Sequence, residues 1–116
     1  MIDVYVYPSC SSCRKTVEEL ESHGVEFRVR DFRKERFTTD ELANVLAQVE
    51  MTPPMALSTR SRVYRERELD AETLGNDDLL KLMVEEPTLL RRPIVIKGDQ
   101  VVIGHIPAKL AALVAS

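Results

Sequence analysis

The chain has 116 residues, of which 44% are hydrophobic and 30% charged, which suits a globular domain and excludes a disordered or fibrous protein. A formal net charge of -3 leaves no basic surface for direct nucleic-acid binding. No apolar run approaches the roughly 20 residues that span a bilayer, and the N-terminus lacks signal-peptide character. We therefore expect a single domain over residues 1–116 in the cytoplasm, where a catalytic or sensing disulfide is more usual than a structural one.

The first quarter of the chain predicts a strand, a helix and a second strand. Residues 2–7 alternate β-branched and aromatic side chains, as in a short buried strand, and Pro8 ends this pattern. The helix that follows should bury one face, which carries Cys13, Val17 and Leu20. Gly24 supplies the helix stop, and residues 25–31 alternate apolar and polar side chains. Because such connections are right-handed, the two strands should be parallel neighbours.

The middle of the chain predicts helices. Thr38 and Glu41 form a capping-box signature before an amphipathic helix that runs to Val49. A second helix should extend from about residue 77 to residue 86, with Pro87 as its stop.

The last quarter predicts a hairpin and a final helix. Residues 94–96 and 101–103 are apolar and flank a Gly-Asp turn, and Pro107 suits the first turn of a helix. The order β-α-β, helices, β-β-α is that of an α/β thioredoxin-like fold with a four-stranded mixed sheet. The helical block at about residues 38–86 would be an insertion. Pro93 opens the third strand, where this fold commonly has a cis peptide bond beside a CxxC motif.

The chain's two cysteines, Cys10 and Cys13, lie directly after the first predicted strand. Cys10 falls where the helix begins, so unpaired backbone N–H groups and the positive end of the helix dipole should face its sulfur. Such an environment lowers the pKa of a thiol and favours a thiolate nucleophile. Cys13 lies one turn further on, close enough to act as the resolving thiol and close a disulfide. A strand–CxxC–helix unit of this kind predicts a redox site.

Two alternatives concern the same cysteines. Structural zinc needs four ligands, and His23 and His105 lack ligand-type spacing, which argues against a zinc site within one chain. A zinc site shared between chains stays open, as does an inert pair of thiols, although the strand-to-helix junction counts against inertness. Neither histidine is placed by the sequence as a base for Cys10. We expect no metal and no bound cofactor.

Arginines supply the cationic candidates for this site. Arg92 should come from the far strand, stabilise the thiolate and offer a bidentate fork to an oxyanion. Arg14 follows Cys13 and could do the same or be ordinary solvated surface. A further cluster comprises Arg60, Arg62, Arg65 and Arg67. Because glutamates alternate with it, this cluster is either a salt-bridged face or an anion clamp or docking patch for an acidic partner.

Three segments together resemble the arsenate reductase (ArsC)/Spx family. They are residues 8–15 (PSCSSCRK), 58–64 (STRSRVY) and 89–96 (LLRRPIVI), collinear over nearly the whole chain. Arg92 and Pro93 match the arginine and strand proline of that family. The resemblance implies a thioredoxin-like fold, a cysteine at position 10 that attacks arsenate, arginines that bind the oxyanion, and glutathione with glutaredoxin as the reductant.

The chain combines features of both branches of this family. Glutathione-coupled arsenate reductases typically have one cysteine, and their further oxyanion arginine would fall near Tyr64, with Arg60 or Arg65 as substitutes. The CxxC, STRS and LLRRP wording is closer to Spx proteins, redox-sensing transcription regulators that bind the C-terminal domain of the RNA polymerase α subunit. The glycine that Spx proteins use in that contact would fall at Thr52.

The sequence thus predicts a thiol–disulfide redox protein with Cys10 as nucleophile and Cys13 as resolving thiol. The first hypothesis is a small arsenate reductase-like oxidoreductase, re-reduced by thioredoxin or by glutathione and glutaredoxin. The alternative is an Spx-like regulator that acts through the RNA polymerase α subunit without touching nucleic acid or membrane. A third interpretation is a thioredoxin-like protein with incidental redox sensitivity.

Overall fold

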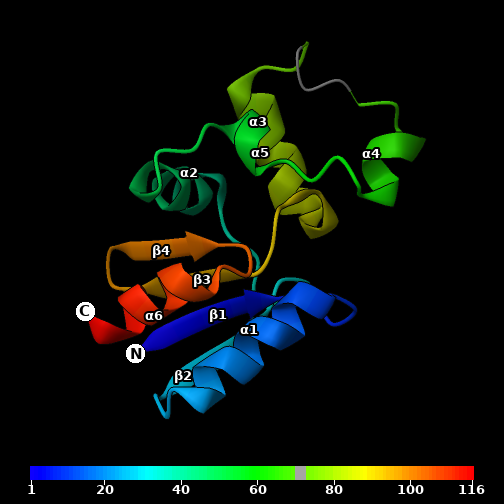
Figure 1. Cartoon of the computed structure of the whole chain (residues 1–116). Coiled ribbons are helices and arrows are strands. Elements are labelled where there is room, and N and C mark those ends of the chain that lie inside the picture. The colour runs from blue at the N-terminus through cyan, green and yellow to red at the C-terminus, as the bar shows by residue number, and fades with distance from the viewer. Residues whose placement is uncertain (70–72) are drawn as a thin grey trace. The chain divides into compact units, whose positions relative to one another are not determined.

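The computed structural model describes residues 1–69 and 73–116, which form two compact units (Figure 1). Residues 1–35 and 92–116 make the first unit, and residues 36–91 make the second. The single-domain organisation expected from the length of the chain stays a prediction. No helix in the described part of the chain is both long enough and apolar enough to cross a membrane.

The first unit is built on a four-stranded mixed sheet with the order β2-β1-β3-β4. Its strands are β1 (Ile2–Val6), β2 (Phe27–Asp31), β3 (Ile94–Lys97) and β4 (Gln100–Ile103). β1 pairs parallel with β2 and antiparallel with β3, and β3 and β4 form an antiparallel hairpin. The predicted mixed sheet is confirmed, although β2 begins at Phe27, two residues later than the alternating pattern suggests.

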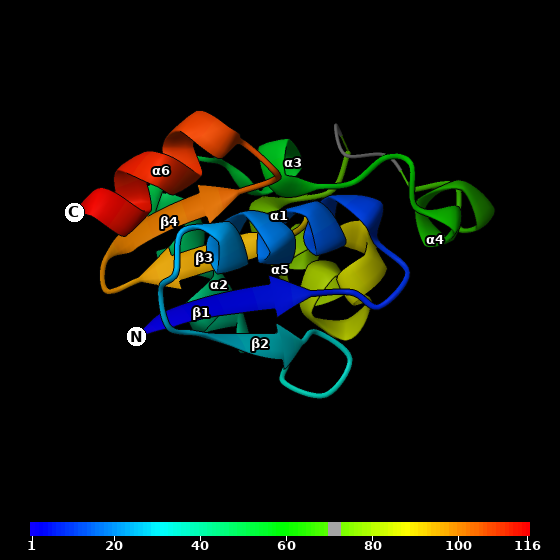
Figure 2. The same cartoon turned by 60° about the horizontal axis from the view of Figure 1, so that its bottom comes forward.

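Helices α1 (Ser11–Ser22) and α6 (Pro107–Ala115) pack on one face of this sheet, as Figure 2 shows. The shared core contains Ile2, Val4, Leu20, Val95, Val102, Leu110 and Leu113. Leu20 of α1 is fully buried there. α1 ends before Gly24, whose φ of 69° suits a residue without a side chain. The sheet face therefore fixes where α1 lies, and with it the first turn that carries the cysteines.

The second unit is helical, as the predicted insertion requires. Its elements are α2 (Thr39–Gln48), α3 (Pro53–Ala56), α4 (Arg62–Glu66), α5 (Asn76–Glu85) and the 3₁₀ turn η1 (Pro87–Leu89). The capping box is present: Thr38 Oγ1 accepts from the Glu41 N–H at 3.1 Å, and Glu41 Oε1 accepts from the Thr38 N–H at 3.0 Å. Residues 70–72 of the predicted insertion lie outside the described residues.

Three short elements of this unit, α3, α4 and η1, are not among the helices that the sequence predicts. The Pro-Pro sequence at positions 53 and 54 lies just beyond the amphipathic helix that was expected to run to Val49, and it opens α3. Proline is tolerated in the first turn of a helix because the N–H it lacks has no partner there. Helices of four or five residues, such as α3 and α4, are too short to show a periodic apolar pattern.

Replacing Leu20 with alanine should test how firmly α1 is held on the sheet. Because this side chain is fully buried in the shared core, Leu20→Ala should lower the free energy of unfolding by about 2–5 kcal/mol. Urea denaturation of the reduced protein, followed by circular dichroism, measures the change. Lys15→Ala is the matched control on the exposed side of α1 and should stay within about 0.5 kcal/mol of the parent. Equal losses in both variants would contradict this packing.

Candidate functional site

Cys10 is the N-cap residue of α1, where the strand-to-helix junction was predicted to place it. Its backbone is extended, with φ -90° and ψ 117°, and its Sγ accepts a hydrogen bond from the Cys13 N–H at 3.3 Å. The Cys10 N–H donates to the Tyr7 carbonyl at 3.0 Å, which closes the turn between β1 and α1. The sulfur thus does what a capping oxygen usually does: it satisfies a backbone N–H that the first helical turn leaves unpaired.

The two thiols have different surroundings. Cys10 is half-buried, whereas Cys13 is only 2% exposed. Burial together with the neighbouring Cys10 sulfur raises the pKa of Cys13 to about 12. Burial alone would also raise the pKa of Cys10. Hydrogen bonds from the side chain and backbone of Cys13, and the charge and hydrogen bond of Arg92, outweigh it and lower that pKa below its ordinary value.

Arg92 reaches the cysteine pair from the segment that leads into β3. The Arg92–Pro93 peptide bond is cis, which confirms the expectation for the residue that opens this strand. Pro93 is buried, and its carbonyl accepts from the Gly104 N–H at 2.8 Å. The Arg92 Cζ atom lies 5.2 Å from the centroid of the Tyr7 ring. The structure therefore brings Arg92 to the Cys10–Cys13 pair, and the catalytic roles of the three residues stay a prediction.

The other two predicted arginines are placed differently. Arg14 is exposed on α1, and its N–H donates to the Cys10 carbonyl at 3.2 Å. Arg60 is exposed in the second unit, and its proposed role in supporting the thiolate stays a prediction. Two members of the arginine cluster have acidic neighbours. Arg62 lies 3.7 Å from Glu66, and Arg67 lies 3.5 Å from Glu86, which fits the interpretation of a solvated, salt-bridged face.

Sequence reasoning missed two contacts near the cysteines. The ring of Tyr7 lies beside Arg92, and Oγ1 of the fully buried Thr16 lies 2.9 Å from His105 Nδ1. Thr16 is one turn beyond Cys13 on the buried side of α1. His105 thus has a partner that the sequence did not reveal. No local pattern signals either contact, because each joins residues more than 80 positions apart in the chain.

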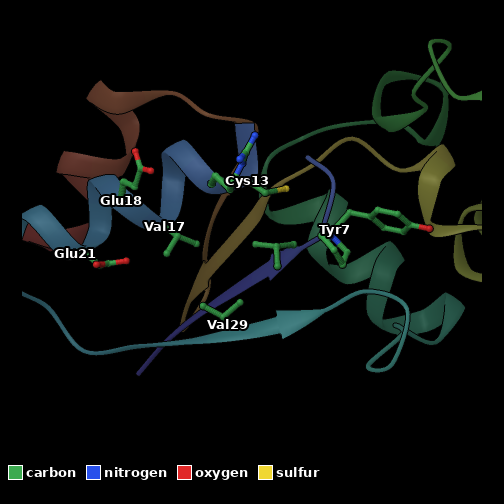
Figure 3. Close-up of a pocket in the computed structure, with 9 residues that line it drawn as sticks. Tyr7, Cys13, Val17, Glu18, Glu21 and Val29 are labelled. Carbon is green, nitrogen blue, oxygen red and sulfur yellow. The ribbon is translucent and has the colours of Figure 1, made fainter. Parts of the chain in front are cut away.

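A groove of about 330 Å³ lies beside the buried thiol (Figure 3). It is lined by Val6, Tyr7, Pro8, Cys13, Arg14, Val17, Glu18, Glu21 and Val29. Val17 of α1 points toward Val29 of β2, a side chain that is 52% exposed. Apolar side chains therefore form much of the groove, with charged residues of α1 along it. Among residues 1–69 and 73–116, no group of three or more His, Cys, Asp or Glu side chains could hold a metal ion.

Comparison with known proteins places this chain in a family. The family model described as the ArsC family matches residues 5–113. The regulatory protein MgsR of Bacillus subtilis is 38% identical over 109 residues, covering 94% of this chain and 86% of that protein. The global transcriptional regulator Spx 1 of Lactococcus lactis is 39% identical over 104 residues, covering 90% of this chain and 81% of that protein.

A solved structure gives the same result for the fold. The putative arsenate reductase from Yersinia pestis has a TM-score of 0.86 and 27% sequence identity, covering 97% of this chain and 99% of that one. The chain belongs to the ArsC family, with a thioredoxin-like fold.

Removing the Arg92 charge should raise the pKa of Cys10 and reduce the fraction of Cys10 that is thiolate near neutral pH. In the reduced protein, iodoacetamide should modify Cys10 at a lower pH than the pH at which it modifies an ordinary thiol. The buried Cys13 should stay unmodified. Arg92→Gln removes a charge and a hydrogen bond that lower the pKa of Cys10. In this variant, the rate at which Cys10 is alkylated at pH 6 should therefore fall by about three- to tenfold, with little change at pH 10.

Peptide mass spectrometry over a pH series measures both rates. Arg28→Gln is the matched control, because Arg28 is exposed in the same unit and pairs with Asp3 at 3.0 Å. It should leave the profile unchanged. An unchanged profile in Arg92→Gln would remove Arg92 from the candidate site.

Proposed function

We propose that this protein is a thiol–disulfide redox protein in which Cys10 is the nucleophile and Cys13 the resolving thiol. One observation carries the proposal: the Cys10 sulfur caps α1 and accepts from the Cys13 N–H at 3.3 Å, and the pKa of Cys10 is lowered while that of the buried Cys13 is raised. A single, reactive thiolate beside a protonated partner is what two-step thiol chemistry needs. Membership of the ArsC family supports the same conclusion.

The chemistry would proceed in two steps. The Cys10 thiolate attacks an electrophilic centre and forms a covalent adduct, and the centre loses one of its own groups: a protonated oxygen that leaves as water from arsenate, or a thiolate from a disulfide. Cys13 then loses its proton and attacks the Cys10 sulfur, so the S–S bond forms, the bond between Cys10 and the attacked centre breaks, and the released group carries two electrons away. The neighbouring Cys10 sulfur helps to raise the pKa of Cys13. Because adduct formation removes the negative charge from Cys10, the first step makes the second thiol easier to deprotonate.

The first candidate activity is reduction of an oxyanion such as arsenate. The position of the Arg92 charge beside the nucleophile supports it, because a guanidinium suits both a thiolate and an oxyanion. The similarity to a putative arsenate reductase also supports it. Arsenate would be reduced to arsenite by two electrons while the dithiol becomes the disulfide. Thioredoxin, or glutathione with glutaredoxin, would return those electrons.

The second candidate function is redox-dependent regulation of transcription. Identities of 38% and 39% to MgsR and Spx 1, each over at least 90% of this chain, favour it. In this hypothesis the Cys10–Cys13 disulfide switches a contact with the RNA polymerase α subunit. Thr52 stands where Spx proteins have the glycine of that contact, and this departure from the Spx pattern counts against the second candidate. Both candidates share the thiol chemistry and differ in what the disulfide serves.

The decisive experiment first tests the shared chemistry. Oxidised wild-type protein should contain an intramolecular disulfide between Cys10 and Cys13, which thioredoxin reduces. Cys13→Ser should instead accumulate a mixed disulfide on Cys10 when treated with a small disulfide, because no resolving thiol remains. Mass spectrometry under denaturing, thiol-blocked conditions measures both species. Absence of the intramolecular disulfide in wild-type protein would overturn the proposal.

Two further measurements separate the candidates. Turnover of arsenate in the presence of a thioredoxin or glutathione system, lost in Cys13→Ser, would support the reductase. No turnover, combined with binding of the RNA polymerase α subunit that differs between oxidised and reduced protein, would support the regulator. Cys13→Ser is the control in both assays because it retains the nucleophile.

A further inference from the structure

The ring of Tyr7 lies against two guanidinium groups. The Arg92 Cζ atom is 5.2 Å from the ring centroid, and the Arg33 Cζ atom is 5.9 Å from it. Both distances are within the range at which the electron-rich face of an aromatic ring attracts a cation. Tyr7 directly follows β1 and precedes Pro8, so its backbone lies at the junction between the strand and the redox helix.

The second of these arginines is itself fixed. Asp31, the last residue of β2, accepts from the Arg33 backbone N–H at 2.8 Å and from Arg33 Nη2 at 3.0 Å. The paired Arg33 side chain is 52% exposed and lies on the Tyr7 ring at the distance given above. The backbone of Tyr7 is held as well, because its carbonyl accepts from the Cys10 N–H at 3.0 Å. Tyr7 therefore contacts the two arginines through its ring and the nucleophilic Cys10 through its backbone carbonyl.

We propose that Tyr7 is a positioning residue for the thiol chemistry: its ring holds the Arg92 guanidinium where that charge faces the Cys10 sulfur. The inference rests on the proposed function and adds a residue to it. Tyr7 need not touch a substrate or exchange a proton for this role.

The physical reason lies in the length of the arginine side chain. A guanidinium on four rotatable bonds spends part of its time away from any one partner, which weakens its average field at the sulfur. The ring offers it a favourable surface beside Cys10 and reduces the number of competing positions. Arg92 lowers the pKa of Cys10 both by its charge and by a hydrogen bond. Both effects depend on the guanidinium staying in place.

Side-chain variants of Tyr7 test the role of the ring while retaining the backbone carbonyl that accepts from the Cys10 N–H. Tyr7→Leu should slow the alkylation of Cys10 by iodoacetamide at pH 6 by about two- to fivefold, with little change at pH 10. Tyr7→Phe keeps an aromatic face and should restore most of the rate. In an Arg92→Gln background, Tyr7→Leu should have no further effect, because the cation that the ring positions is gone.

Tyr5 provides a matched control in the same part of the chain. Its ring lies 5.8 Å from the Arg30 Cζ atom, the same kind of contact, although Arg30 pairs with Asp3 and Glu35 rather than with a cysteine. Tyr5→Leu should leave the pH profile of Cys10 unchanged. Circular dichroism and urea unfolding establish that each variant is folded under the assay conditions.

The outcomes decide the proposal independently of the proposed function. An unchanged profile in Tyr7→Leu, an equal loss in Tyr5→Leu, or an undiminished effect of Tyr7→Leu in the Arg92→Gln background would overturn the role of Tyr7. The measurement uses reduced protein and needs no disulfide. If Cys10 and Cys13 failed to form a disulfide while Tyr7→Leu still shifted the profile, the redox function would fail and the positioning role would stand.

Discussion

The hydrogen bond from the Cys13 N–H to the Cys10 sulfur is the interaction on which the site depends. It requires that β1 stop at Val6, that the chain turn through Pro8, and that α1 begin directly after Cys10. An N-cap normally uses an oxygen of Ser, Thr, Asp or Asn. With sulfur in that place, the group that completes the helix is also the group that reacts. Charge on this sulfur is favoured by the backbone donor and by the helix dipole, so helix stability and thiol ionisation are coupled.

The packing of α1 then makes the two thiols unequal. The face that buries Leu20 in the core also buries Cys13 two turns earlier, and burial disfavours its thiolate. Cys10, at the helix end, retains access to solvent. Burial still opposes ionisation of Cys10, but the polar partners of this sulfur outweigh that cost. One short helix with a single buried face thus gives one cysteine the properties of a nucleophile and the other those of a protonated resolving thiol.

Features with a local cause could be predicted from the sequence, and those with a distant cause could not. The start of α1 at the CxxC, the stop at Gly24 and the capping box at Thr38 each follow from a few adjacent residues. Arg92 and the cis bond to Pro93 were reached through the fold and the family resemblance rather than through local pattern. The contacts of Tyr7 with Arg92 and of Thr16 with His105 depend on how β1, β3 and the segment after β4 meet in space. Apolar periodicity identifies the elements that pack, but it does not say which polar side chains their packing brings into contact.

Disulfide formation would alter this arrangement in a definite way. Oxidation removes the negative charge from Cys10, and with it the partner that the charge of Arg92 stabilises and the strongest acceptor for the Cys13 N–H. The Cys13 N–H in the first turn of α1 and the N–H groups of Arg92 then lose the Cys10 thiolate as their acceptor. In a reductase, the Cys10 thiolate that attacks an oxyanion substrate would return only after re-reduction. In a regulator, the same redistribution of charge would distinguish the oxidised from the reduced surface. Because Cys10, Cys13, Tyr7 and Arg92 all belong to the first compact unit, this change of charge is a property of that unit alone, and the two functions would be alternative uses of one electrostatic event.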